Sequence, residues 1–249
     1  MHIVVDLDST LLNNERQVSE YTLERLKEIR SNGHLLIINT ARSLSNSLKI
    51  IDTVKPDYSI LNGGSLVVDK ELNVIYKNPF SDNLHNIINE LQIFGEKIAL
   101  QTINVLYTTD SEYKAQNAVY KDLKQDKVLE EVYKIIFICE EEKIAYSLAK
   151  KYDIECINYL NGPWYRFTPL GVTKFSGIEN LLKIINGKME DVIAFGDDYS
   201  DLEMLLKVGH GVAMKDSIPE VYEKVKNHAD SCDEDGVVKY LDNYFSEAL

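Results

Sequence analysis

Two aspartates at the beginning of the sequence stand where a carboxylate can react. Asp6 and Asp8 directly follow the apolar run His2-Ile3-Val4-Val5, which reads as a short buried strand. A carboxylate at a strand tip can act as a nucleophile, and a second one two residues further can serve as general acid and then general base. This arrangement suits phosphoryl transfer through an aspartyl phosphate on Asp6, with Asp8 as the acid/base. Taken alone, an Asp-x-Asp after a strand is more often a turn with a helix N-cap.

A second acidic segment offers ligands for a metal ion. Gly196-Asp197 follows another apolar run, and Asp201 comes four residues after Asp197. An anionic nucleophile that attacks a phosphate needs a cation beside it, and Mg²⁺ often binds through one or two carboxylates plus substrate phosphate. We expect Asp6 and Asp197 to supply these carboxylates and Asp201 to hold a coordinated water or orient a lysine. The alternative is an acidic cap on the following helix.

Two further residues can neutralise or bind a phosphate. Lys174 opens a predicted helix, where a cation opposes the helix dipole. A functional explanation is that its ammonium and the helix N-terminus both face the phosphate. Thr40 follows the second predicted strand and can donate its hydroxyl to a phosphate oxygen, although strand propensity or N-capping explains it almost as well.

The composition limits the classes of partner. The net charge of −13 argues against nucleic acid or an anionic membrane surface, because both require a basic face. The three cysteines, Cys139, Cys156 and Cys232, are scattered and form no Cys-x-x-Cys pair. No apolar segment approaches the length that spans a bilayer. We therefore expect a soluble, cytoplasmic protein with a small-molecule partner.

The elements that must position these residues alternate along the chain. Strands predicted at residues 2–5, 35–38 and 58–61 are separated by helices at 18–30 and 43–54, and a hairpin follows at 66–76. The same rhythm returns after Gly171, with helices at 173–185, 202–208, 219–226 and 237–245 and strands at 192–195 and 210–214. This alternation predicts a Rossmann-like, doubly wound α/β core with a parallel sheet. Its carboxyl edge is where ligands bind.

The middle of the chain has a different character. Helices are predicted at 84–94, 112–124 and 140–151, with strands at 98–107, 132–139, 154–160 and 164–167 around the turn Asn161-Gly162-Pro163. Helices with antiparallel-looking strand pairs indicate an α+β module inserted into the first domain. We expect a catalytic core at 1–79 and 169–249 and an inserted cap at 80–168.

The ordered motifs resemble those of the haloacid dehalogenase (HAD) superfamily, in particular its Cof-type phosphatases with a type-IIB cap. The resemblance covers nearly the whole chain and is carried by Asp6-x-Asp8-x-Thr10, Thr40-Ala41-Arg42, Gly171-Val172-Thr173-Lys174, Gly196-Asp197-x-x-x-Asp201, Gly211-Val212-Ala213-Met214 and Asp233-Glu234-Asp235-Gly236-Val237. It implies Mg²⁺ as cofactor, held by Asp6, the main-chain carbonyl of Asp8, Asp197 and Asp201. It also implies that Arg42 binds substrate, that Asn62-Gly63-Gly64 lines the cleft and that the cap selects the substrate.

The sequence departs from this family at two positions and leaves the exact reaction open. Ser200 stands where asparagine is usual, so a phosphate or metal-water contact there is weakened or replaced; Ala41 stands where glycine is usual. We expect hydrolysis of small phosphate monoesters, such as sugar phosphates. The alternatives are a phosphomutase or phosphotransferase of the same superfamily, or a catalytically silent metal-binding regulator. Nothing in the sequence indicates the oligomeric state.

Overall fold

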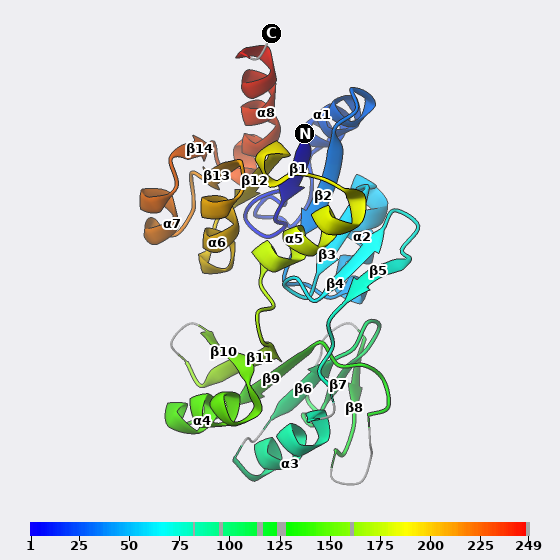
Figure 1. Ribbon diagram of the computed structural model, residues 1–249, viewed down its shortest axis with the longest axis vertical. Coiled ribbons are helices and arrows are strands. Elements are labelled where there is room, and N and C mark those ends of the chain that lie inside the picture. Colours follow the sequence, from blue (N-terminus) through cyan, green and yellow to red (C-terminus); the bar gives the residue numbers. More distant parts are fainter. Residues whose placement is uncertain (82, 95–96, 114–116, 124–127, 160–161, 248–249) are drawn as a thin grey trace. The chain divides into compact units, whose positions relative to one another are not determined.

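The chain folds into two compact units. The computed structural model describes residues 1–81, 83–94, 97–113, 117–123, 128–159 and 162–247 (Figure 1). One unit, called the core below, comprises Met1–Ala41, Lys49–Tyr76 and Thr173–Leu249. The other, called the inserted unit, comprises Arg42–Leu48 and Lys77–Val172. Each unit has its own hydrophobic cluster and is described by itself.

An eight-stranded sheet with the order β14-β13-β12-β1-β2-β3-β4-β5 forms the centre of the core. Its strands are β1 (His2–Val5), β2 (Leu35–Asn39), β3 (Tyr58–Leu61), β4 (Leu66–Asp69), β5 (Val74–Lys77), β12 (Val192–Gly196), β13 (His210–Met214) and β14 (Asn227–Ala229). The pairs from β14 through β3 are parallel, and β4 runs antiparallel to β3. The central strands are apolar and buried, as a parallel sheet covered on both faces requires.

The direction in which the sheet grows reverses at β1. The chain first adds β2 and β3 on one side of β1, and later adds β12, β13 and β14 on the other side. Val5 of β1 is paired with Ile38 of β2 and with Phe195 of β12. Ligands of open α/β sheets bind beyond the carboxyl ends of the strands at such a switch point. The residues that follow Val5 and Gly196 therefore occupy the position where this architecture places a site.

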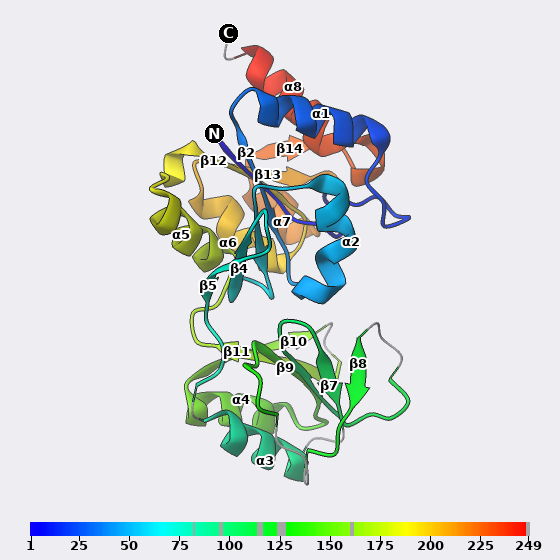
Figure 2. The same ribbon diagram turned by 90° about the vertical axis from the view of Figure 1, so that its right-hand side faces the viewer.

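Helices cover both faces of the core sheet (Figure 2). They are α1 (Glu20–Ser31), α2 (Leu44–Val54), α5 (Lys174–Ile185), α6 (Tyr199–Lys207), α7 (Pro219–Lys224) and α8 (Gly236–Glu247). Strands are added in opposite directions on the two sides of β1. With right-handed crossovers, α1 and α2 therefore lie on one face of the sheet, and α6 and α7 lie on the opposite face (Figure 2). On that second face, Val4, Ile37 and Ile60 of the sheet pack with Leu181 of α5 and Met204 of α6.

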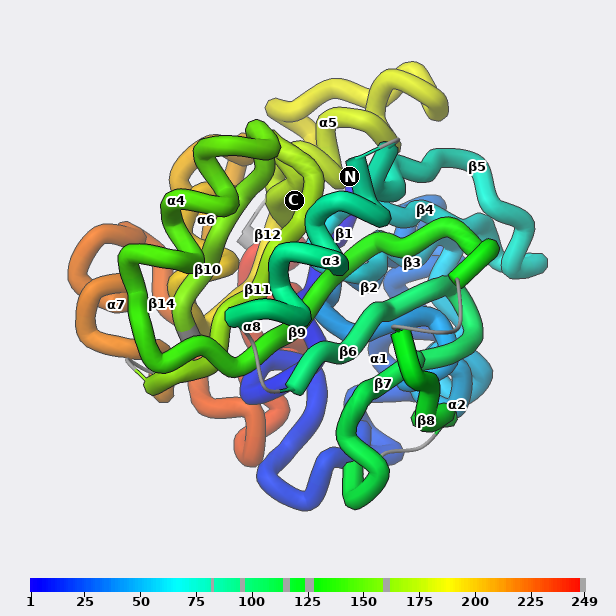
Figure 3. The backbone as a smooth tube through the Cα atoms, turned by 90° about the horizontal axis from the view of Figure 1, so that it is seen from below, coloured from blue at the N-terminus to red at the C-terminus, as the bar shows by residue number. Residues whose placement is uncertain are grey.

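The inserted unit is an α+β module. Its six-stranded sheet has the order β10-β11-β9-β6-β7-β8, and only β7 and β8 are parallel among the pairs that the structure describes. The strands are β6 (Ile98–Gln101), β7 (Leu106–Thr108), β8 (Ala118–Tyr120), β9 (Lys134–Ile138), β10 (Ile154–Tyr159) and β11 (Trp164–Pro169). Helices α3 (Leu84–Phe94) and α4 (Glu142–Tyr152) cover one face of this sheet (Figure 3), with Leu91 and Leu148 packed among Leu100, Phe137 and Phe167.

The doubly wound α/β core with an inserted α+β unit confirms the predicted fold class. The predicted domain limits, with the cap at 80–168, stay a prediction. Most elements lie within two or three residues of their predicted positions. Among the residues that the structure describes, no helix is long and apolar enough to cross a membrane.

Two local predictions were wrong, and one strand was missed. The helix expected at 112–124 contains strand β8, which pairs with β7 after Asn117 adopts a left-handed backbone with φ of 62°; residues 114–116 and 124 of that segment lie outside the described residues. The strand expected at 98–107 is two strands, because Thr102 and Val105 close a turn between them. Strand β14 was not predicted, since three residues at a sheet edge carry little periodicity. Asn161 of the predicted turn also lies outside the described residues.

Candidate active site

Asp6 and Asp197 lie side by side at the carboxyl edge of the core sheet. Asp6 follows β1 and Asp197 follows β12, and these two strands are neighbours in parallel register. The backbone N–H of Asp6 continues the ladder by donating to the carbonyl oxygen of Phe195 at 3.1 Å. Two segments far apart in the sequence therefore present carboxylates to the same point.

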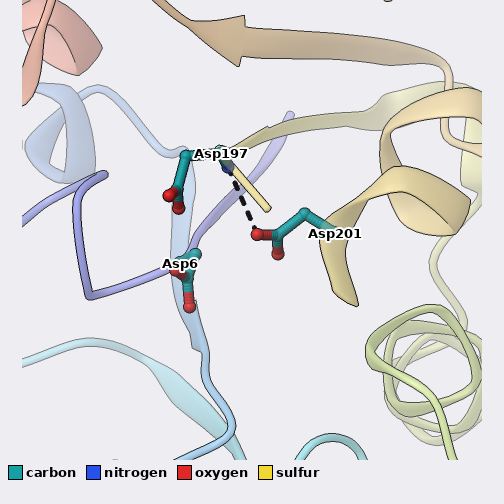
Figure 4. Close-up of side chains that lie close together, drawn as sticks. All are labelled: Asp6, Asp197 and Asp201. Atoms are coloured by element: carbon teal, nitrogen blue, oxygen red, sulfur yellow. Dashed lines mark hydrogen bonds between the residues drawn. The ribbon is translucent and has the colours of Figure 1, made fainter. Parts of the chain in front are cut away.

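Asp201 completes a cluster of three carboxylates. One oxygen from each of Asp6, Asp197 and Asp201 lies within 4.8 Å of the other two. Figure 4 shows the three side chains gathered from the ends of β1 and β12 and from the first turn of α6. Asp6 and Asp201 are buried and Asp197 is partly buried. Three acidic groups this close repel one another unless cations lie between them.

Lys174 supplies one such cation. Its ammonium lies 2.8 Å from Oδ1 of Asp6 and 2.6 Å from Oδ1 of Asp201, and its side chain is 3% exposed. Since the three carboxylates outnumber this single ammonium, the cluster keeps a negative excess when all its groups are ionised. The ion pairs fix the relative positions of Asp6, Lys174 and Asp201.

Both oxygens of Asp201 have partners within the protein. Oδ2 accepts hydrogen bonds from the backbone N–H groups of Asp197 and Asp198, each at 3.2 Å, and Oδ1 accepts from the ammonium of Lys174. A Cβ atom at Gly196 would lie 2.5 Å from Cγ of Asp201, so only glycine permits this approach. Asp201 therefore serves to organise the loop and hold the lysine.

The N-terminus of α5 is fixed from several directions. Thr173 is its N-cap and forms a capping box with Ser176. The side-chain N–H of Asn39, the last residue of β2, donates to the carbonyl oxygen of Lys174 at 2.9 Å. A Cβ at Gly64 would lie 2.0 Å from the carbonyl oxygen of Thr173, so the turn after β3 packs directly on the helix start. These contacts hold the backbone from which the Lys174 side chain reaches the carboxylates.

The electrostatics of the cluster favour an additional cation. Burial raises the pKa of Asp6 to about 8, against the opposing effect of Lys174. Burial, together with Asp201 and Asp198, raises the pKa of Asp197 to about 7. Burial by itself would lower the pKa of Lys174, but Asp201 and Asp6 raise it above its ordinary value. Even with the lysine beside them, the pKa values of both carboxylates stay above the ordinary value for aspartate, and a divalent ion at this place would favour their ionised forms.

The donor set fits a hard divalent cation. All the donors in the cluster are carboxylate oxygens, which Mg²⁺ prefers over nitrogen or sulfur. Because Asp201 is occupied by backbone N–H groups and by Lys174, the oxygens that remain for a metal belong to Asp6 and Asp197. Thr10 donates to Oδ1 of Asp197 at 3.2 Å, which leaves Oδ2 of that residue for a ligand.

The other predicted site residues are distributed as follows. Thr40 directly follows β2, is buried, and donates its backbone N–H to the carbonyl oxygen of Ile60. Asp8 is exposed in the loop after Asp6. Ser200 is the second residue of α6 and is partly buried, and its backbone N–H donates to the Asp198 carboxylate. Arg42 belongs to the inserted unit and is partly buried.

Sequence reasoning missed three residues that organise the site. Asn39 holds the carbonyl oxygen of Lys174, Gly196 admits Asp201, and Thr10 orients Asp197. Thr10 and Gly196 were noted only as parts of the motifs around Asp6 and Asp197, without these roles. The signal for Asn39 was an amide at the end of a buried apolar strand, where a polar side chain requires a partner.

The sequence of this chain is similar to those of known hydrolases. A family model described as haloacid dehalogenase-like hydrolase matches residues 3–241. A relative from Bacillus subtilis (strain 168), the 5-amino-6-(5-phospho-D-ribitylamino)uracil phosphatase YitU, is 27% identical over 274 residues, covering 98% of this chain and 97% of that protein.

Solved structures share the whole architecture. A haloacid dehalogenase-like hydrolase from Bacteroides thetaiotaomicron has a TM-score of 0.85 at 22% identity, with 98% of each chain covered. The HAD subclass IIB sugar phosphatase BT4131 has a TM-score of 0.78 at 20% identity, again with 98% of each chain covered. At these identities the structures establish the fold of the chain.

Proposed function

The chain belongs to the haloacid dehalogenase-like hydrolases, and we propose that it is a magnesium-dependent phosphatase that hydrolyses small phosphate monoesters through an aspartyl phosphate on Asp6. The observation that carries this proposal is the convergence of Asp6, Asp197 and Asp201 beside the buried ammonium of Lys174. Phosphoryl transfer depends mainly on positioning and on neutralisation of charge, and this cluster offers both.

In the first step a carboxylate oxygen of Asp6 attacks phosphorus, and the bond between phosphorus and the ester oxygen breaks. Asp8 gives its proton to the leaving alkoxide, so the alcohol departs neutral. Asp8 is exposed two residues after the nucleophile, where a substrate oxygen can reach it. Lys174 and the hydroxyl of Thr40 bind the non-bridging oxygens, and we also assign Arg42 and Ser200 to substrate binding.

Magnesium, held by Asp6, Asp197 and the main-chain carbonyl of Asp8, would supply the positive charge that lets an anionic nucleophile approach an anionic phosphate. Asp201 contributes by holding Lys174, because its two oxygens are already hydrogen-bonded.

In the second step Asp8, now a carboxylate, takes a proton from water. The water oxygen forms a bond to phosphorus while the bond to Asp6 breaks. Inorganic phosphate leaves, Asp6 is regenerated, and the proton on Asp8 restores the starting state.

The choice of substrate rests on the relatives. YitU is named a phosphatase of 5-amino-6-(5-phospho-D-ribitylamino)uracil, and BT4131 is named a sugar phosphatase. The substrate that each name states is a phosphate ester of a polyhydroxylated carbon chain or ring. We therefore propose phosphorylated sugars and sugar alcohols as the substrate class, with the predicted cap at residues 80–168 selecting among them in the cytoplasm.

The test is a panel of phosphate esters assayed for phosphate release with Mg²⁺, with a chelator, and with Asp6→Asn. The panel includes hexose phosphates, pentitol phosphates and the YitU substrate. Magnesium-dependent turnover that disappears in Asp6→Asn is the expected result. Transfer of phosphate to an added sugar in preference to water would instead identify a phosphomutase, and absence of turnover across the panel would indicate a regulatory protein.

A further inference from the structure

Asn62 carries two unfavourable features at once. It directly follows β3, and its side chain is buried, with the residue 1% exposed. Neither Nδ2 nor Oδ1 has a hydrogen-bond partner among the residues that the structure describes. Its backbone is left-handed, with φ of 52°.

Both features oppose folding. A buried amide without partners loses its hydration, and each unsatisfied group costs on the order of 1–3 kcal/mol. A left-handed backbone adds a smaller penalty, which asparagine tolerates better than most residues. Glycine avoids both penalties, and the next two residues of this turn, Gly63 and Gly64, are glycines with positive φ. Unsatisfied polar groups and unusual backbone conformations concentrate where a ligand completes the bonding.

The turn that contains Asn62 is attached to two groups that we assign to phosphate binding. The backbone N–H of Gly63 donates to the carbonyl oxygen of Thr40 at 3.0 Å. Gly64 packs against the carbonyl oxygen of Thr173, which directly precedes Lys174. Since β1, β2 and β3 are adjacent parallel strands, Asp6, Thr40 and Asn62 follow three neighbouring strands at one edge.

We propose that the carboxamide of Asn62 binds the substrate, with Nδ2 donating to a phosphoryl oxygen and Oδ1 accepting from a hydroxyl group near the ester. This inference rests on the proposed phosphatase function and deepens it, because the acceptor Oδ1 requires a donor on the substrate. The substrate class that satisfies both atoms is a phosphate ester of a polyhydroxylated compound. Among the described residues of the turn, Asn62 alone carries a carboxamide, which offers a donor and an acceptor on two separate atoms.

The deciding variant is Asn62→Gly. Glycine removes the unsatisfied amide and accepts φ of 52° without strain, so we expect the melting temperature to stay unchanged or to rise. We expect kcat/KM for a pentitol or hexose phosphate to fall at least tenfold. A residue with a purely structural role would lose stability together with activity, so a fall of several degrees in Tm would overturn the proposal, as would unchanged kcat/KM.

A matched control separates the backbone effect from the amide. Leu72 has φ of 65° in the turn between β4 and β5. Because β4 runs antiparallel to β3, this turn lies at the opposite edge of the sheet. Leu72→Gly relieves the same kind of strain, and its kcat/KM should equal that of the unmodified chain.

A comparison of two substrates tests the proposed contact between Oδ1 of Asn62 and a substrate hydroxyl. The loss in Asn62→Gly should be larger for the polyol phosphate than for p-nitrophenyl phosphate, which has no hydroxyl group next to the ester. Equal losses for both substrates would refute the contact to Oδ1. Binding of inorganic phosphate with Mg²⁺, measured by calorimetry, should weaken in Asn62→Gly, and unchanged phosphate affinity would refute the contact to Nδ2. If the unmodified chain neither binds phosphate nor turns over any ester, the proposed function itself fails and this inference falls with it.

Discussion

The ammonium of Lys174 lies 2.8 Å from Oδ1 of Asp6, although β1 and the start of α5 are separated by most of the chain. This ion pair joins the candidate nucleophile to a cation that the sheet and helix hold in place. The ammonium reduces the repulsion between Asp6 and a bound phosphate, both of which are negatively charged. The pair is the basis of the first two predictions.

Asp6→Asn should remove turnover without unfolding the protein. An amide cannot form the aspartyl phosphate, and loss of a covalent nucleophile lowers kcat by roughly a thousandfold or more. The buried carboxylate is replaced by a neutral group of the same shape, so the melting temperature should change little. Phosphate release and thermal denaturation measure the two effects. Asp52→Asn, an exposed aspartate on α2, should keep full activity. Robust phosphate release by Asp6→Asn would exclude this residue as the nucleophile.

Lys174→Met should reduce both activity and stability. The side chain is buried between Asp6 and Asp201, so its removal leaves buried carboxylates without their cation. Breaking a buried ion pair in this way costs roughly 3–5 kcal/mol in the free energy of unfolding, and loss of one charge donor at the phosphate lowers kcat about 100-fold or more. Urea denaturation and steady-state kinetics are the measurements. Lys183→Met, on the exposed side of the same helix, is the control. An unchanged kcat in Lys174→Met would contradict the assigned role.

Asp197 and Asp201 should differ in their effect on the metal. Asp197 keeps one carboxylate oxygen without a hydrogen-bond partner among the described residues, whereas both oxygens of Asp201 are held by backbone N–H groups and Lys174. We expect Asp197→Asn to raise the Mg²⁺ concentration for half-maximal activity at least tenfold. Asp201→Asn should lower kcat because Lys174 is displaced. It should raise the Mg²⁺ concentration for half-maximal activity less than Asp197→Asn does. Magnesium titrations of both variants decide the point, and the reverse order would make Asp201 the direct ligand.

The sequence predicted the positions that follow strands better than the contacts between them. Asp6, Thr40, Lys174 and Asp197 were found because strand ends and helix starts can be read locally and parallel strands share one carboxyl edge. The bond from Asn39 to Lys174 and the approach of Asp201 to Gly196 depend on pairing of distant segments, which no local pattern encodes. The helix expected at 112–124 failed for the same reason, since strand β8 is stabilised by its neighbour β7.

The Asp201 side chain packs against Gly196 so closely that no larger residue fits at this position. A Cβ at this position would lie 2.5 Å from Cγ and 2.6 Å from Cβ of Asp201, which is closer than real Cβ contacts allow. Gly196→Ala should therefore displace Asp201 and release Lys174, so kcat should fall in the manner of Asp201→Asn. The double variant Gly196→Ala/Asp201→Asn should lose little more than either single variant, because both act through one contact. Additive losses in kcat would show that Gly196 acts by another route. Gly33→Ala, where a Cβ meets no atom within 4 Å but φ is 87°, controls for loss of stability without loss of the site.

The difference in stability between the unmodified chain and Lys134→Met should depend on pH, and the unmodified inserted unit should gain stability as the pH rises. Burial, together with the nearby charge of Arg166, lowers the pKa of Lys134 to about 8 from the 10.5 of an unperturbed lysine. Between these two values the unfolded chain binds more protons at this lysine than the folded chain does, so the free energy of unfolding rises with pH. Below about pH 8 the lysine is charged in the folded state, and its burial destabilises that state. Lys134→Met should therefore be more stable than the unmodified chain at pH 7, on the order of 3 kcal/mol from the size of the shift.

This advantage of Lys134→Met should shrink as the pH rises from about 8 to about 10, because the lysine of the unmodified chain becomes neutral in the folded state first. Urea denaturation at pH 7, 8, 9 and 10 measures the difference between the two chains. Lys150→Met, an exposed lysine on α4, should show no comparable gain at pH 7, since burial is the main cause of the shift at Lys134. A Lys134→Met chain that is less stable at pH 7, or a difference that does not depend on pH, would show that the ammonium at this position stabilises the fold.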